Sequence, residues 1–257
     1  MNFVLSRTTA LLLVSLAISF AGCNSGGSNN TLGIQQKSEL VFNLEDGESQ
    51  TVVTFGTSLT HIILSNWVQT LDADLDARFP GQTTVINRAF GQTDSIWALA
   101  VLDVILGDAP DTIFIEFAIN DAQANRGISL AQSEANLDLI IDRILDALPN
   151  CEIILMTMNP PVRESFEQRP RYKEYYQVYR DVAQRRDLLL IDHEANWDEL
   201  LDEQPNLFDL YVPDTVHPNE QGSLAVITPE INKRIGLEPR LTRFQRIVRT
   251  LLSPLPF

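Results

Sequence analysis

Cysteine, histidine and positive charge are scarce in this sequence of 257 residues. It contains two cysteines and three histidines. Its 19 Lys and Arg residues face 34 Asp and Glu residues, so that the formal net charge is −15. A protein that takes nucleic acid as its main partner needs a basic surface, because phosphate binding is electrostatic. The acidic balance therefore argues against nucleic acid as a partner.

Internal repeats and interior low-complexity linkers are also absent from the sequence. Hydrophobic residues make up 44% of the chain and charged residues 21%, a balance typical of globular proteins rather than of disordered ones. A chain of this length can form one sizeable α/β domain but hardly two. We therefore predict a single domain over residues 38–237.

Residues 1–22 have the features of a signal peptide. A single cation, Arg7, precedes an apolar stretch that is too short and too poorly flanked for a transmembrane helix. The stretch ends in FAGC, which resembles the lipobox of bacterial lipoproteins. We therefore expect a lipid on Cys23, a flexible tether over 23–37 and a membrane anchor in the bacterial cell envelope. The alternative is a plain secretory signal; with Cys23 lipidated, Cys151 has no partner for an intrachain disulfide.

The last residues, 238–257, form a segment of different charge. They contain four arginines and one acidic residue, Glu238, and their apolar residues recur with helical spacing. A basic amphipathic tail of this kind either lies on an anionic membrane surface or docks on the acidic body of the protein. The sequence leaves both possibilities open.

Short apolar runs alternate with longer segments of helical period in the predicted domain. The runs cover residues 51–55, 83–87, 111–117, 151–158 and 188–192. The helical segments cover 62–79, 95–106, 129–148, 171–186 and 220–235, and 129–148 has the clearest 3.6-residue period. This alternation predicts a parallel sheet with helices on both faces. We expect one more strand, ELVFNL, to pair at an edge of the sheet.

Polar residues follow the apolar runs where each predicted strand ends, and in such a sheet ligands bind at the carboxyl ends of the strands. FGTSLT follows the first run, NRAFGQTDS the second and AIND the third, while DTVHP lies near the end of the domain. These segments contain Ser58, Gly91, Asn120, Asp214 and His217. The sequence therefore predicts that these five residues meet at one edge of the sheet.

The residue types in these segments fit nucleophilic catalysis. A serine hydroxyl is a poor nucleophile until a base removes its proton, and the base is usually a histidine oriented by a carboxylate. Backbone N–H groups of Ser58 and Gly91 and the side-chain amide of Asn120 could stabilise the developing oxyanion. Ser58 alone would be interpreted as the N-cap of a helix. The two roles are compatible, and we expect Ser58 to begin a helix.

The four segments resemble, in order and spacing, the sequence blocks of the SGNH (GDSL-type) hydrolase family. The resemblance implies a three-layer α/β/α, flavodoxin-like fold with a five-stranded parallel sheet. It also implies hydrolysis of carboxylic esters with no metal or other cofactor. Carried over by position, Ser58 is the nucleophile, His217 the base and Asp214 the acid that orients it. Ser58, Gly91 and Asn120 form the oxyanion hole.

The sequence departs from the pattern of the family at three places. Thr57 stands where the family has an aspartate that helps order the loop, so a lower activity is expected. Ala118 replaces the glycine of the third block. The spacing from Asn87 to Gly91 is one residue shorter than usual, so the backbone N–H of Gln92 is the alternative donor.

Two other histidines and a tyrosine-rich segment lie outside these blocks. His61 follows Ser58 by three residues, but the sequence shows no carboxylate partner for it, so we interpret it as a helix or pocket-rim residue. His193 ends the fifth apolar run and has a predicted structural or substrate-lining role. Residues 169–180 are read as an amphipathic helix with half-buried tyrosines, and the alternative is a rim that stacks on sugars.

The resemblance implies a secreted esterase of short acyl groups, with acetyl on a carbohydrate as the leading substrate and an acyl-Ser58 intermediate. A lysophospholipase or thioesterase of the same family is one alternative. A catalytically weak, envelope-anchored glycan-binding module is another, supported by Thr57 and the shortened second block. The expected partners are a small-molecule or glycan ester and, through Cys23, the membrane. The sequence does not indicate an oligomeric state.

Overall fold

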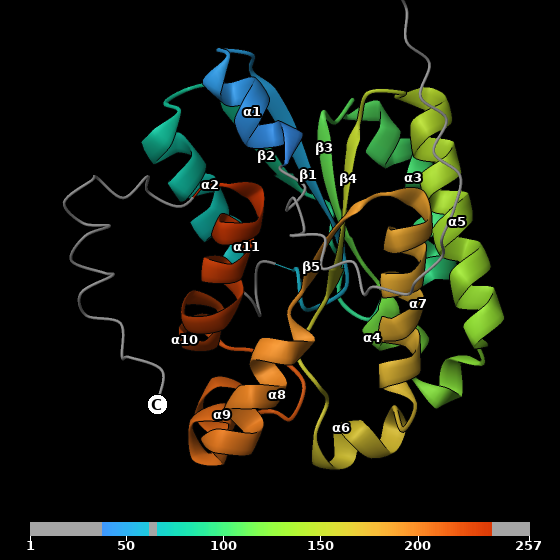
Figure 1. Cartoon of the computed structure of the whole chain (residues 1–257). Coiled ribbons are helices and arrows are strands. Elements are labelled where there is room, and N and C mark those ends of the chain that lie inside the picture. Colours follow the sequence, from blue (N-terminus) through green and yellow to red (C-terminus); the bar gives the residue numbers. More distant parts are fainter. Residues whose placement is uncertain (1–37, 62–65, 238–257) are drawn as a thin grey trace, which may run out of the picture. The chain divides into compact units, whose positions relative to one another are not determined.

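The structure is a computed structural model that describes residues 38–61 and 66–237 (Figure 1). The predicted signal peptide, tether and C-terminal tail, at 1–22, 23–37 and 238–257, lie outside the described residues. Within the described residues, no helix is both long and apolar enough to cross a membrane.

A sheet of five parallel strands is the centre of the fold, with the strand order β2-β1-β3-β4-β5. The strands are β1 (Gln50–Gly56), β2 (Thr83–Asn87), β3 (Thr112–Glu116), β4 (Glu152–Thr157) and β5 (Leu189–Asp192). This is the flavodoxin-like order, in which the chain reverses its winding direction between β1 and β3. The predicted parallel sheet and its five strands are confirmed. Their continuous apolar runs arise because helices bury the central strands on both faces.

Helices cover the two faces of the sheet as two groups. The helices are α1 (Glu39–Glu45), α2 (Trp67–Arg78), α3 (Ser95–Gly107), α4 (Ala118–Asp121), α5 (Leu130–Ala147), α6 (Arg163–Gln168), α7 (Tyr172–Arg186), α8 (Glu194–Glu203), α9 (Pro205–Tyr211), α10 (Glu220–Gly222) and α11 (Thr228–Ile235). A 3-10 turn spans Ala124–Arg126 and a π-helical turn spans Ser223–Ile227. Figure 1 shows α1, α2 and α11 on one side of the sheet and α3, α5 and α7 on the other.

The segment ELVFNL was expected to be an edge strand, and this prediction was wrong because the segment forms helix α1. The Ser38 hydroxyl caps the helix by accepting the Leu40 N–H, at 3.2 Å. Leu40 and Leu44 are four residues apart, so one helical face buries both. The carboxylate of Glu152 on β4 also accepts the N–H groups of Glu39 and Leu40, at 3.0 Å each. Glu152, which lies 112 residues after Leu40 in the sequence, thus favours the helix.

The carboxyl ends of the strands lead into the short helices at one edge of the sheet. β3 continues into α4, β4 leads to α6 and β5 leads to α8, all toward the lower edge in Figure 1. Burial at this edge is high even for polar residues: Thr57, Asn120 and Asp121 are all buried. The polar residues predicted to follow the strands are therefore concentrated at the same edge.

Candidate active site

Ser58 lies in a tight turn directly after β1. The backbone carbonyl of Thr57 accepts the N–H groups of Thr60 and His61, at 3.1 Å each, and its hydroxyl accepts the Leu59 N–H at 3.2 Å. The expectation that Ser58 begins a helix was wrong: α2 begins only at Trp67. Thr57, and not Ser58, caps the turn, and this leaves the Ser58 hydroxyl free for another contact.

That contact is made with His217, which lies 159 residues further along the chain. The Nε2 atom of His217 is 2.7 Å from the Oγ atom of Ser58. The Nδ1 atom of the same imidazole is 2.6 Å from Oδ2 of Asp214. The structure thus brings together the predicted serine, histidine and aspartate in one chain of hydrogen bonds. Such a chain allows the histidine to take the serine proton while the carboxylate fixes its tautomer.

Asp214 also shapes the loop that carries His217. Its Oδ1 atom accepts the backbone N–H groups of Val216, at 3.2 Å, and His217, at 2.7 Å. Thr215 has a left-handed backbone, with φ of 74°, so the loop turns sharply between acid and base. Burial alone would raise the pKa of Asp214, but hydrogen bonds from the His217 backbone and imidazole hold that pKa below its ordinary value. Asp214 is therefore a carboxylate when it faces the imidazole.

Asn120, on α4, presents an amide to the same site. Its Nδ2 atom donates to the Thr93 carbonyl at 2.8 Å, and its Oδ1 atom accepts from Nη2 of Arg169 at 3.4 Å. An amide nitrogen carries two hydrogens, so one remains for a ligand. Among the described residues, the backbone N–H of Ser58 has no hydrogen-bond acceptor. Both groups can therefore donate to an oxyanion.

The second sequence block brings Gln92 to the cleft that contains Ser58, and Gly91 is not in the cleft lining. Gln92 has a left-handed backbone, with φ of 63°. Its carbonyl accepts a hydrogen bond from Nη2 of Arg126 at 2.9 Å. A methyl group added at Gly91 would meet no atom within 4 Å, so neither conformation nor space requires a glycine there. The shortened spacing of the block is thus accommodated at Gln92.

The cleft around Ser58 has a volume of about 530 Å³. Its lining consists of Ser58, Gln92, Asn120, Gln123, Asn125, Arg126, Ser165, Gln168, Arg169, Val216 and His217. Among the described residues of that lining, Val216 is the only one with an aliphatic side chain and none carries a carboxylate. Arg126 is neutralised by Asp94, at 2.6 Å, whereas Arg169 is buried among the carbonyls of Ile119 and Ser165. Burial lowers the pKa of Arg169.

The two other histidines stand apart from the proton chain. His61 packs edge-on against Phe90, with ring centroids 5.9 Å apart. His193 is completely buried at the start of α8 and does not line the cleft, so a substrate-lining role does not apply. Neither ring nitrogen of His193 has a hydrogen-bond partner in the described part of the chain, and burial lowers its pKa to about 4.

The tyrosine-rich segment forms α7, and four of its tyrosines face the core. They are Tyr172, Tyr175, Tyr176 and Tyr179. The Tyr179 hydroxyl oxygen accepts the Phe117 N–H at 2.9 Å. The interpretation as an amphipathic helix is confirmed, with the tyrosines more deeply buried than expected. The sugar-stacking alternative does not apply to these four rings.

Sequence patterns did not identify the polar wall of the cleft. Gln123, Arg126 and Gln168 come from short segments after β3 and β4, which carry no periodic signal. Arg169 begins the segment 169–180, which was interpreted as an amphipathic helix, and that pattern did not point to the cleft. Glu116 was also missed, although a carboxyl in the apolar run TIFIE is an available signal. It is 2% exposed, and burial raises its pKa to about 7, against hydrogen bonds from Thr60 and Thr57 that lower it.

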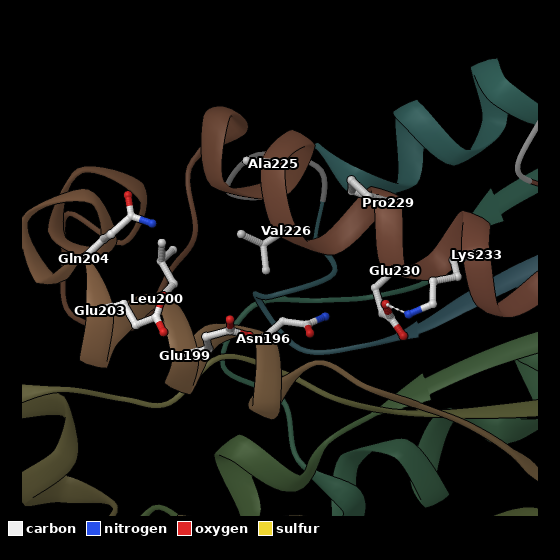
Figure 2. Close-up of a pocket in the computed structure, with 10 residues that line it drawn as sticks. All are labelled: Asn196, Glu199, Leu200, Glu203, Gln204, Ala225, Val226, Pro229, Glu230 and Lys233. Atoms are coloured by element: carbon white, nitrogen blue, oxygen red, sulfur yellow. Dashed lines mark hydrogen bonds and ion pairs between the residues drawn. The ribbon is translucent and has the colours of Figure 1, made fainter. Parts of the chain in front are cut away.

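A second cavity, of about 320 Å³, lies between α8 and the segment that includes α11 (Figure 2). Its lining includes Glu199, Glu203 and Glu230, and Lys233 pairs with Glu230 at 3.1 Å. In the part of the chain that the structure describes, it shares no residue with the cleft around Ser58, and no serine, cysteine or histidine lines it. Its described lining therefore contains no serine–histidine or cysteine–histidine pair of the kind found in the cleft around Ser58.

Comparisons with known proteins show the family of the chain. Residues 54–225 match the model of the GDSL-like lipase/acylhydrolase family. The sequence matches none of the curated proteins with which it was compared. Among solved structures, Axe2, an acetylxylan esterase from Geobacillus stearothermophilus, is similar with a TM-score of 0.64 and 20% identity, over 74% of this chain and 95% of that chain.

Two further structures show the same fold. LAE5, an α/β hydrolase from the metagenome of Lake Arreo, has a TM-score of 0.62 and 24% identity, over 75% of this chain and 97% of its own. A structure from Parabacteroides merdae, described as a GDSL-like lipase, has a TM-score of 0.63 and 16% identity, over 74% and 97%. The chain therefore belongs to the GDSL-like lipase/acylhydrolase (SGNH) family and is a carboxylic ester hydrolase.

Proposed function

We propose that the protein hydrolyses its ester through an acyl-enzyme on Ser58. The observation that carries this proposal is the chain of short hydrogen bonds from Ser58 through His217 to Asp214. His217 takes the Ser58 proton as Oγ attacks the ester carbonyl, and the resulting imidazolium passes the proton to the leaving alcohol. Water then attacks the acyl-Ser58 ester with His217 again as base, and the acid and free serine are released.

The oxyanion of each tetrahedral intermediate is held by the Ser58 N–H and by Nδ2 of Asn120. Both are free to donate in the described part of the chain, and each such donor contributes about 10²–10³ in kcat. The third donor is the backbone N–H of Gly91, as the family pattern implies, or that of Gln92. The cleft lining supports Gln92.

The substrate we propose is a short acyl ester, acetyl in particular, on a carbohydrate. The cleft supports this because its lining is almost entirely amides, hydroxyls and guanidinium groups, which suit a polyhydroxylated alcohol. Val216 alone is aliphatic, so the described cleft has no apolar slot for a long acyl chain. This disfavours a lysophospholipase. That a structural neighbour is an acetylxylan esterase is a further, weaker support.

We also propose that the protein is carried to the bacterial cell envelope and anchored there by a lipid on Cys23. The support is the sequence FAGC at the end of residues 1–22. Replacing Cys23 by Ala is expected to move the protein from the membrane fraction to the soluble fraction. Retention of Cys23→Ala in the membrane fraction would contradict the anchor.

Hydrolysis of p-nitrophenyl acetate tests the esterase proposal, with the unmodified protein measured beside Ser58→Ala and His217→Ala. His61→Ala is a matched control, because His61 is near Ser58 in the sequence but not in the proton chain. We expect activity to be lost in the first two variants and kept in the control. Equal rates in all four proteins would contradict the esterase site and favour a glycan-binding module.

A further inference from the structure

Glu116 is a buried carboxyl directly beneath the turn that carries Ser58. It is the last residue of β3 and is paired in register with Gly56, the last residue of β1. A Cβ atom on Gly56 would lie 2.8 Å from the Glu116 carboxyl carbon and 2.9 Å from its backbone oxygen. Gly56 is therefore needed to make room for this carboxyl between the two strands, at the point where the chain leaves the sheet.

The carboxyl of Glu116 accepts hydrogen bonds from Thr57, which precedes Ser58, and from Thr60, which follows it by two residues. Its Oε1 atom accepts the Thr57 N–H at 2.6 Å and the Thr60 hydroxyl at 2.7 Å. The Thr57 hydroxyl is 3.0 Å from Oε1 and 3.1 Å from Oε2. Thr57, Thr60 and Glu116 are all at most 2% exposed, so water does not compete for these bonds.

We propose that Glu116 is a positioning residue for the reaction, which fixes the turn at Thr57 and Thr60 so that Ser58 faces His217. The inference rests on the proposed function. Glu116 touches no atom of the Ser58–His217 pair and acts only through the two threonines. The family pattern expects an aspartate at position 57 to order this loop. Here Thr57 supplies donors and Glu116 supplies the carboxylate, so the departure does not leave the loop without support.

The charge of Glu116 fits this role. An ionised carboxylate only accepts hydrogen bonds, so it can take the three donors of Thr57 and Thr60 together. A neutral carboxyl carries a proton of its own, and one threonine hydroxyl would have to turn away. Burial raises the pKa of Glu116, with a smaller contribution from Asp121, while the threonine donors oppose the rise. The donors of Thr57 and Thr60 thus favour the ionised form of Glu116, while burial favours the neutral form.

Glu152 offers a matched control at the opposite edge of the sheet. It is the first residue of β4, and its carboxylate accepts the Ser38 hydroxyl at 2.8 Å and the Glu39 and Leu40 N–H groups at 3.0 Å. It therefore resembles Glu116 in its hydrogen bonds but supports α1 and not the turn of Ser58. Glu152→Gln therefore shows how much stability is lost when such a carboxylate is removed, without any effect on the position of Ser58.

The experiment compares kcat and KM of the full chain with those of Glu116→Gln, Thr60→Val, the double variant and Glu152→Gln. Glu116→Gln and Thr60→Val are expected to lower kcat by about 10- to 100-fold, since small displacements of a nucleophile have effects of this size. KM is expected to stay within about threefold of the unmodified protein, because substrate contacts are kept. The double variant is expected to be no slower than Glu116→Gln, because both substitutions act on the same hydrogen bond between Glu116 and Thr60. Glu152→Gln is expected to keep the full kcat.

Hydrogen exchange of the Thr57 N–H is measured in parallel, because it does not depend on hydrolysis. We expect it to be slow in the full chain and fast in Glu116→Gln. Unchanged kcat in Thr60→Val or in folded Glu116→Gln would overturn the inference and leave the esterase site standing. Additive losses in the double variant would overturn it as well. No hydrolysis by the unmodified chain, with a protected Thr57 N–H, would instead contradict the proposed function itself.

Discussion

Asp214 and His217 are joined by both oxygens of one carboxylate. Oδ1 accepts the His217 backbone N–H at 2.7 Å, and Oδ2 is 2.6 Å from Nδ1 of the imidazole. The same side chain therefore fixes the conformation of the loop and the orientation of the ring. The spacing of three residues between acid and base allows this double contact.

Replacing Asp214 by Asn separates these functions. An asparagine oxygen can still accept the backbone N–H groups, but its NH₂ group would face Nδ1 and favour the wrong imidazole tautomer. We expect kcat to fall by about 10³–10⁴-fold with little change in melting temperature. Asp214→Ala is the comparison, since it also removes the loop contacts and should lower the melting temperature. A kcat for Asp214→Asn within tenfold of the unmodified protein would contradict the role of the carboxylate.

Arg169 and Asn120 are expected to act as a unit. Arg169 holds the Asn120 carbonyl oxygen while Thr93 holds its NH₂ group, so the second hydrogen of Nδ2 is aimed by both contacts. Asn120→Ala should lower kcat by about 10²–10³-fold. Arg169→Met should lower kcat less, and should have no further effect in the Asn120→Ala background. Additive effects of the two substitutions on kcat would show that Arg169 acts independently of the amide.

The length of the acyl group tests whether the cleft can bury an apolar chain. The described lining has Val216 as its only aliphatic side chain, so a long acyl chain would remain in water. We expect kcat/KM for p-nitrophenyl esters to fall by at least about tenfold from acetyl to octanoyl, the reverse of the order that apolar burial would give. The leaving group, p-nitrophenol, is the same throughout this series, so only the acyl group changes. A rate that rises with chain length would support the lysophospholipase alternative.

His193 is expected to make the fold sensitive to acid. Burial lowers the pKa of its imidazole from 6.5 to about 4, so the folded protein binds this proton less readily than the unfolded chain. The contribution to the free energy of unfolding is complete above about pH 6.5 and is lost as the pH falls toward 4. At pH 5 the loss is on the order of 2 kcal/mol.

Glu116 acts in the opposite direction, since its raised pKa makes the fold less stable as the pH rises from about 4.5 to about 7. The two effects are separated by comparing two proteins. The free energy of unfolding in urea is measured for the unmodified protein and for His193→Phe, at pH 7.5 and at pH 5. We expect the stability difference between the two proteins to shift in favour of His193→Phe at pH 5. The same difference at both pH values would show that His193 titrates normally.

The sheet and the proton chain could be predicted from the sequence for a common physical reason. Strands buried on both faces are continuous apolar runs, and polar residues that follow them, such as Ser58 and Asn120, are collected at one edge by the parallel arrangement. The structure brings Ser58, Asp214 and His217 together as the residue types and their order indicated. Their catalytic roles remain the proposal that the experiments above address.

The predictions that failed, and the residues that were missed, depend on contacts between segments far apart in the sequence, which local patterns do not show. ELVFNL has strand-like composition, but Glu152 binds its first N–H groups and stabilises a helix. Ser58 looks like a helix cap, but Thr57 and Glu116 organise the turn instead. The cleft wall around Arg169 comes from short segments, including the six-residue helix α6 and a 3-10 turn, which are too short for a periodic signal. In each case the deciding contact joins segments that no local pattern connects.

The reactivity of Ser58 tests the proposed proton chain most directly. We would treat the full chain with a serine-directed phosphonate and locate the adduct by peptide mass spectrometry. We expect one adduct, on Ser58, which is absent in Ser58→Ala and forms far more slowly in His217→Ala because the proton acceptor is missing. Labelling of another residue, or labelling of Ser58 at the same rate with and without His217, would contradict it.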